Sequence, residues 1–119
     1  MLEPAVRALA ARAPVPVEVI GHAADRLSAA VETAAYFVVS EALTNVSKYA
    51  HAEHATVRVE RLNGELLVEV SDDGVGGASA TNGSGLRGLA DRVAALSGTL
   101  EVSSPPCRGT RLLARLPCT

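Results

Sequence analysis

The 119-residue chain has little of what marks the more specialised classes of protein. It has two cysteines, no tryptophan, and only 3% aromatic residues. Because Cys107 and Cys118 make neither a metal-site spacing nor a disulfide framework, we interpret them as reduced thiols of a cytoplasmic protein. With so few aromatic rings, the core has to be built from alanine, valine and leucine.

Long apolar runs and an excess of one charge are also missing. No stretch is long enough to span a bilayer, and the start shows no signal-peptide pattern, so we expect no membrane contact from this segment. A membrane anchor of the full-length protein would have to lie elsewhere. The formal net charge of -2 gives no electrostatic footprint for nucleic acid. A chain that is 48% hydrophobic is instead typical of one globular domain.

The hydrophobic pattern divides the chain into helices and strands. Helical spacing predicts helices at residues 2–12, 28–50 and 89–96. Alternation predicts strands at residues 15–20, 55–62, 65–71, 99–103 and 110–116. Ser28 is the expected N-cap of the long helix, and Asn63-Gly64 is the expected two-residue hairpin turn. This order favours an α+β fold, a two-layer α/β sandwich with one mixed, mainly antiparallel sheet and helices packed on one face.

Two glycine-rich stretches flank a small, polar segment, residues 78–84, which predicts a flexible loop. Asp72-Asp73-Gly74-Val75-Gly76 follows a strand, and Gly83-Ser84-Gly85-Leu86 precedes a helix. Glycines let the backbone approach a flat or charged ligand, and amides at a helix start bind anions. The second stretch could therefore hold a polyphosphate, although neither a P-loop nor a βαβ dinucleotide fold accompanies it.

Polar side chains border the apolar stripe of the long predicted helix. At about 100° per residue, Glu41, Asn45 and Lys48 lie within roughly 60° of one another. Asn45 could donate an oxygen to Mg²⁺, Lys48 could neutralise phosphate, and Glu41 could orient a water or a nucleophile. Asp72, when ionised, only accepts hydrogen bonds, which suits the exocyclic amine of adenine. One ligand, Mg·ATP, requires all of these roles.

The residues in this order resemble a known superfamily. Glu41–Ala50 resembles the N box of the ATPases that include gyrase, a heat-shock chaperone, mismatch-repair proteins and histidine kinases, the GHKL or Bergerat-fold superfamily. Asp72–Gly76 resembles its G1 box, D-x-G-x-G, and Gly83–Leu86 resembles its G2 box. The resemblance extends from about Pro14 to Leu116, with the boxes in the same order and at similar spacing.

Within this superfamily the chain is similar to the catalytic, ATP-binding domain of a sensor histidine kinase. The short interval between the G1 and G2 boxes and the segment Gly85–Val93 resemble the branch that pairs with helix-turn-helix response regulators. That branch typically has histidine where this chain has Tyr49, which is similar to what other histidine kinases carry there.

The resemblance implies a set of ligand contacts. The adenine and ribose side would be formed by Asp72, on the adenine amine, with Gly74, Gly76 and Tyr49. The metal and phosphate side would be formed by Asn45, on Mg²⁺, with Lys48, Gly83, Gly85 and Leu86. Glu41 would be the candidate catalytic base or the group that orients the acceptor. Residues 78–84 would be the mobile ATP lid.

The implied function is phosphoryl transfer in a two-component system. The domain would bind Mg·ATP and donate the γ-phosphoryl group to a histidine on a separate dimerisation domain of the same kinase, which then serves a response regulator. The chain contains no segment of the acceptor type E-x-x-R-I-A-R-E-L-H-D, and His22, His51 and His54 are expected at the surface or in loops. We therefore expect a fragment of a cytoplasmic kinase, in which residues 1–13 are the remnant of a linker helix and residues 14–119 are the ATP-binding core.

Two alternatives remain open at this point. One is a serine kinase of the same superfamily that acts on an anti-anti-sigma factor, since such proteins are complete at about this length. The other is a non-catalytic nucleotide-binding or docking module.

Overall fold

A computed structural model describes residues 2–13, 15–21, 27–45, 53–74, 84–103 and 109–117. In these ranges the elements are α1 (Leu2–Arg12), β1 (Val17–Ile20), α2 (Ala29–Asn45), β2 (Ala55–Leu62), β3 (Glu65–Asp72), α3 (Ser84–Ala95), β4 (Thr99–Ser103) and β5 (Thr110–Pro117). The strands form one sheet in the order β1-β2-β3-β5-β4. Only β1 and β2 run parallel, and the other neighbouring pairs are antiparallel.

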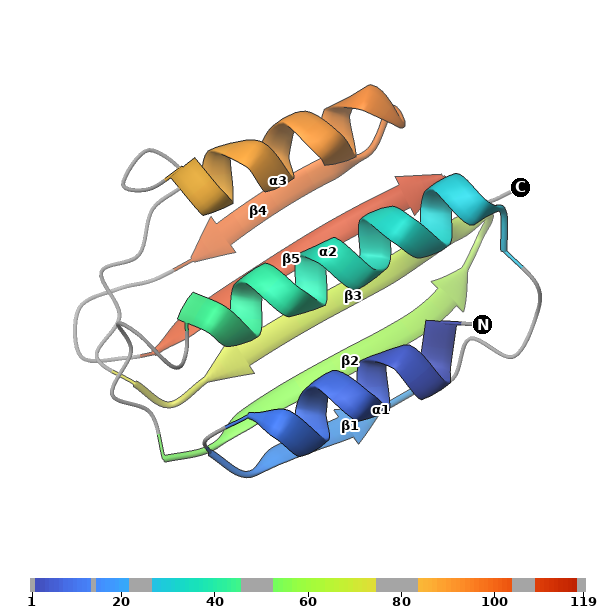
Figure 1. Ribbon diagram of the computed structural model, residues 1–119. Helices are drawn as coiled ribbons and strands as arrows, with labels where there is room; N and C mark the ends of the chain where they lie inside the picture. The colour runs from blue at the N-terminus through green and yellow to red at the C-terminus, as the bar shows by residue number, and fades with distance from the viewer. Residues whose placement is uncertain are drawn as a thin grey trace.

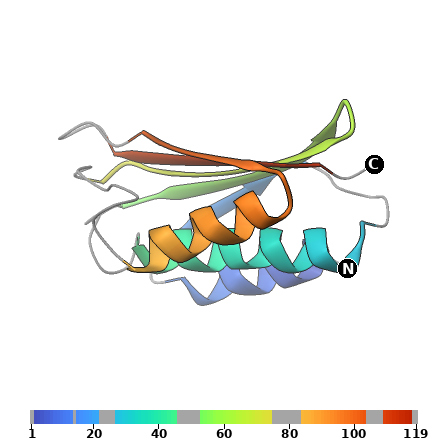
Figure 2. The same ribbon diagram turned by 90° about the horizontal axis from the view of Figure 1, so that it is seen from above.

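The three helices lie on one face of the sheet, with α2 between α1 and α3 (Figure 1). Viewed along the layers, the sheet and the helices form two separate levels (Figure 2). The predicted α+β sandwich, with a mixed and mainly antiparallel sheet, is confirmed.

The core lies between these layers and consists of aliphatic side chains. From Leu66 to Val70, every second residue of β3 is buried, as its alternating pattern predicts. Helix α2 contributes the predicted stripe, in which Val38 is fully buried. Leu2 and Val6 of α1 are 4% and 1% exposed, so α1 packs as part of the same core. The proposed division at residue 13 stays a prediction.

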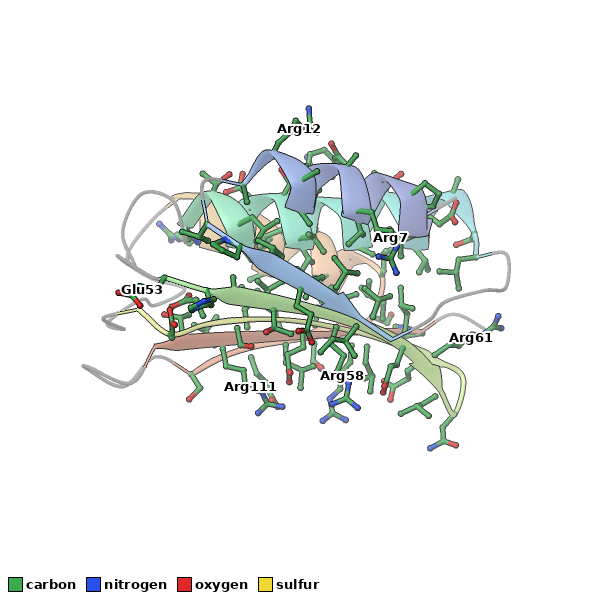
Figure 3. The ribbon with its side chains drawn as sticks, turned by 90° about the horizontal axis from the view of Figure 1, so that it is seen from below. Arg7, Arg12, Glu53, Arg58, Arg61 and Arg111 are labelled. Carbon is green, nitrogen blue, oxygen red and sulfur yellow. The ribbon has the colours of Figure 1, made fainter. Side chains whose placement is uncertain are left out.

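The other face of the sheet carries charged side chains that point away from the helices (Figure 3). Arg111 Nε donates to Glu69 Oε2 at 2.6 Å, and Arg58 pairs with Glu60 at 3.0 Å. Both arginines are more than half exposed and both glutamates are partly exposed, and ion pairs at the surface contribute at most about 1 kcal/mol each.

The predicted N-cap and the predicted hairpin turn are both confirmed. The amide of Val31 donates to Ser28 Oγ at 3.2 Å, so Ser28 is the N-cap of α2. Asn63 and Gly64 have φ values of 52° and 78°, and Leu62 pairs with Glu65 across the turn. Positive φ at both central residues matches the right-handed twist of the flanking strands, so β2 and β3 form the expected tight hairpin.

Several boundaries differ from the predictions. Strand β1 begins at Val17 rather than at residue 15, because Pro16 has no amide to donate to a ladder. Helix α3 begins at Ser84 rather than at residue 89, so it includes Gly85 and Gly88. Glycine weakens a helix by only about 1 kcal/mol, and the buried Leu89 and Val93 anchor this one on the sheet.

Helix α3 ends at Ala95, one residue before the predicted end. Ser97 adopts the left-handed conformation, with a φ of 61°. The amide of Gly98 then donates to the Val93 carbonyl at 2.9 Å, which closes a Schellman-type end.

Helix α2 is described as far as Asn45, and residues 46–50 of the long predicted helix lie outside the described residues. None of the described helices combines the length and the apolar character needed to cross a membrane.

Candidate functional site

One end of the sheet gathers the segments that sequence analysis singled out. There β3 ends at Asp72, β2 and β5 begin, α2 reaches Asn45, and α3 starts at Ser84 (Figure 1). The structure therefore brings Asn45, Asp72, Gly74 and the first turn of α3, with Gly85 and Leu86, to the same end. The predicted contacts that lie outside the described residues are Lys48, Tyr49, Gly76 and Gly83.

Asp72 is the last residue of β3 and is half-buried. Its carboxylate oxygen Oδ1 accepts a hydrogen bond from the amide of Gly74 at 2.8 Å, and Gly74 itself is buried. This bond closes a tight turn in which the side chain of Asp72 is held by the backbone two residues further on. The turn presents a carboxylate in a fixed orientation at the end of the sheet.

Burial raises the pKa of Asp72 above the ordinary value of 3.8. Backbone hydrogen bonds from Gly74 and Thr110 oppose this rise in pKa, and the neighbouring charge of Asp73 adds to it. Water is therefore partly replaced by protein around a carboxylate that two amides hold in place. Such a group is a good acceptor for a neutral donor, for example an exocyclic amine of a base.

Sequence analysis missed the contribution of Gly109 and of Thr110, the first residue of β5. Thr110 pairs with Asp72 across the β3–β5 ladder, so its amide reaches the Asp72 carboxylate. Gly109 is buried with a φ of 79°, and a Cβ at this position would overlap the carbonyl oxygen of Asp72. Only glycine fits both the backbone conformation and this close approach. A Gly-Thr pair before an alternating strand is the available sequence signal, but the pairing register is needed to place it beside Asp72.

Sequence analysis also missed Asp73. Its Oδ1 accepts hydrogen bonds from the amides of Glu53 at 2.8 Å and His54 at 3.0 Å. Its Oδ2 lies 3.2 Å from Nδ1 of His54. Backbone hydrogen bonds from His54 and Glu53 hold the pKa of Asp73 below its ordinary value. His54 is thus an exposed histidine, as predicted, and its side chain contacts Asp73 of the G1 box.

Glu41 and Asn45 lie on the side of α2 that faces α3. The guanidinium of Arg92, from α3, stacks 4.1 Å from the ring centroid of Phe37, which places Phe37 on that side. Glu41 and Asn45 follow Phe37 at steps of four residues. They therefore lie on the same side of α2, closer to the end of the sheet that carries Asp72. Both are half-buried, as expected for a rim where helix meets sheet. Their chemical roles stay predictions.

The described part of the chain contains no cluster of three or more His, Cys, Asp or Glu side chains that could hold a metal ion. Asn45 is partly accessible at the described end of α2. An amide oxygen of this kind fits Mg²⁺ bound mainly through phosphate and water oxygens, since Mg²⁺ in phosphate sites takes few protein ligands.

Comparisons with known proteins show which family the chain resembles. Residues 30–119 match the family model described as "Histidine kinase-, DNA gyrase B-, and HSP90-like ATPase". The chain is 35% identical over 100 residues to the oxygen sensor histidine kinase NreB of Staphylococcus carnosus, covering 81% of this chain and 29% of NreB. It is 37% identical over 101 residues to an uncharacterized sensor-like histidine kinase of Chloroflexus aurantiacus, covering 77% of this chain and 17% of that protein.

Among solved structures, the chain is similar to the blue-light activated histidine kinase of Erythrobacter litoralis. The TM-score is 0.80 at 25% sequence identity, over 98% of this chain and 40% of that one. The chain therefore spans less than half of this structure, and between 17% and 29% of the two curated relatives.

Proposed function

Because the chain belongs to the family of histidine kinase-, DNA gyrase B- and HSP90-like ATPases, we propose that it binds Mg·ATP at the end of the sheet that carries Asp72. The observation that carries this proposal is the half-buried carboxylate of Asp72, held by the amides of Gly74 and Thr110. An ionised carboxylate accepts hydrogen bonds and does not donate them, so this arrangement fits the exocyclic amine of adenine.

The other ligand contacts follow the resemblance of the boxes. Gly74 and Gly76 would shape the base pocket, and Tyr49 would line the base or ribose. Phosphate contacts would come from Lys48 and from the chain around Gly83, Gly85 and Leu86. Asn45 would hold Mg²⁺, which neutralises charge on the phosphates when it is bound.

The reaction would be transfer of the γ-phosphoryl group to a histidine of a separate dimerisation domain of the same kinase. A bond forms between a nitrogen of that histidine and the γ-phosphorus, and the bond from the γ-phosphorus to the bridging oxygen of ADP breaks. Glu41, one turn before Asn45 on the same side of α2, would take the proton or orient the acceptor. Positioning and charge neutralisation supply most of the catalysis in such transfers. The phosphorylated histidine would then serve a response regulator.

Calorimetric titration with ATP, with and without Mg²⁺, tests the binding site. We expect Asp72→Asn to weaken binding by at least about tenfold, because it exchanges a charged acceptor for a group that presents a donor to the amine. Asn45→Ala should remove mainly the dependence on Mg²⁺. Asp91→Asn, an exposed aspartate in the middle of α3, is the matched control and should bind like the wild type. A wild-type chain that binds no ATP at millimolar concentration would favour a docking module instead.

Phosphoryl transfer is tested by adding the histidine-bearing domain. Labelled phosphate should appear on that domain and not on this chain alone. Stable autophosphorylation of this chain alone would contradict the proposal, and transfer to a serine of a partner protein would favour the serine-kinase alternative.

A further inference from the structure

Asp73 joins two segments of chain just beyond the end of a regular ladder. The pairing of β2 with β3 ends at Ala55 and Asp72. One step further, the amide of Asp73 donates to the His54 carbonyl at 3.3 Å. In the other direction, the Asp73 carboxylate accepts from the amides of Glu53 and His54 at 2.8 and 3.0 Å. The side chain of Asp73 therefore closes the site end of the β2–β3 pair.

The carboxylate of Asp73 makes charge-assisted hydrogen bonds. A carboxylate that accepts two backbone amides makes charge-assisted hydrogen bonds, which are shorter and stronger than neutral ones. The carboxylate uses Oδ1 for both amides, while Oδ2 lies against the imidazole of His54. The side chain of Asp73 is half-exposed, and the contacts of this side chain with the described residues are polar.

Asp73 is also the middle residue of the turn that presents Asp72. The hydrogen bond from the Gly74 amide to Asp72 Oδ1 spans it. A displacement of Asp73 would therefore move both partners of that bond.

On the other side, Glu53 and His54 directly precede β2, and Asn45 is the last described residue of α2. Asp73 thus joins the residues before β2 to the turn that presents Asp72, the residue to which the proposed function assigns the adenine contact.

We propose that Asp73 is a positioning residue for the nucleotide site. By holding the chain at Glu53 and His54, its carboxylate fixes the turn that presents Asp72 against the residues before β2. This inference rests on the proposed function. Asp73 acts through Asp72 and through the start of β2, and it is not itself a ligand of the nucleotide.

Three variants separate the effect of the hydrogen bonds that Asp73 accepts from the effect of its charge. Asp73→Ala removes the acceptor of both amides. Asp73→Asn keeps a neutral oxygen for the same two amides and loses the charge opposite the imidazole. His54→Ala removes the ring and keeps its backbone amide.

The dissociation constant for ATP, measured by calorimetry on the full chain, is the main readout. We expect Asp73→Ala to raise it by about tenfold, while Asp73→Asn and His54→Ala stay within about twofold of the wild type. Gly64→Ala, at the far end of the same hairpin, controls for a general loss of stability and should leave the dissociation constant unchanged.

Amide hydrogen exchange in the absence of nucleotide gives a second readout. Exchange at Gly74 should accelerate in Asp73→Ala and stay slow in Asp73→Asn. A folded Asp73→Ala chain that binds ATP like the wild type overturns the positioning role, and so does an Asp73→Asn chain that binds as weakly as Asp73→Ala. A wild-type chain that binds no nucleotide, with the expected exchange pattern at Gly74, overturns the proposed function instead.

Discussion

The two ends of the β2–β3 hairpin are held in different ways. At one end, Asn63 and Gly64 close the turn with positive φ at both positions. At the other end, where no turn joins the strands, the carboxylate of Asp73 accepts hydrogen bonds from the amides of Glu53 and His54, which directly precede β2. The first end is held by the conformation of two adjacent residues, and the second by side-chain contacts between segments that are distant in the sequence.

This difference separates a structural end from a candidate functional one. The hairpin end exposes an apolar side chain, Leu62, at 50% of its surface, and its turn is formed by the backbone conformation of Asn63 and Gly64. The site end combines β2, β3 and the start of β5 around the half-buried carboxylate of Asp72. Contacts from several segments can hold a group in an orientation that no local turn would favour. We expect substitutions at the two ends to affect binding and stability differently.

The largest expected effect in this comparison is that of Gly109→Ala, at the site end. The new Cβ would overlap the carbonyl oxygen of Asp72, and alanine would have to adopt a φ of 79°. We expect a loss of roughly 2–4 kcal/mol in the free energy of unfolding and at least about tenfold weaker ATP binding. Urea unfolding and calorimetry measure the two quantities. Unchanged ATP binding would show that the approach of β5 does not position Asp72.

A smaller effect is expected from Gly64→Ala, at the hairpin end. Gly64 has nearly the same φ, 78°, so the cost of a left-handed alanine is matched between the two variants. We expect about 1 kcal/mol of lost stability and no change in ATP affinity. The same two measurements apply. If Gly64→Ala weakens ATP binding as much as Gly109→Ala does, the functional difference between the two ends disappears.

The smallest expected effect is in the pH dependence of stability, where the neighbouring carboxylates of the site end should act in opposite directions. The pKa of Asp72 is raised above 3.8, so its ionisation costs stability as pH rises through the interval above that value. The pKa of Asp73 is lowered, so its contribution is present above 3.8 and is lost as pH falls through its folded pKa.

Unfolding free energies of two variants, measured across acidic and neutral pH, test this opposition. At neutral pH, Asp72→Asn should make the nucleotide-free chain slightly more stable than the wild type, although it loses ATP binding. Asp73→Asn should make it slightly less stable, and the difference should vanish in strong acid. Two variants with the same sign of effect at neutral pH would contradict the assigned environments.

Much of the fold could be read from local patterns. The alternation in residues 65–71 predicts a strand with Asp72 at its end, and the structure has β3 there. Ser28 and Asn63-Gly64 were predicted as a cap and a turn, and both are confirmed. The resemblance to the ATP-binding domain of histidine kinases is also confirmed by the family match. In each case the signal lies in the order and spacing of residues along the chain, so it can be recognised without knowledge of the tertiary structure.

The beginning of α3 shows where a local pattern is misleading. Gly85 and Gly88 suggest a loop, yet the helix includes both. Burial of Leu89 and Val93 against the sheet outweighs the modest helix penalty of glycine, and burial depends on contacts that propensity does not describe.

The sequence by itself determined the family, the order of the elements and the candidate ligands Asn45 and Asp72, because box motifs and periodicity are local. Only the tertiary structure decided what surrounds Asp72. The β3–β5 register puts Thr110 opposite it, Gly109 packs on its carbonyl, and Asp73 reaches back to His54. These contacts join segments that are far apart along the chain, and pairing and close packing in three dimensions select them.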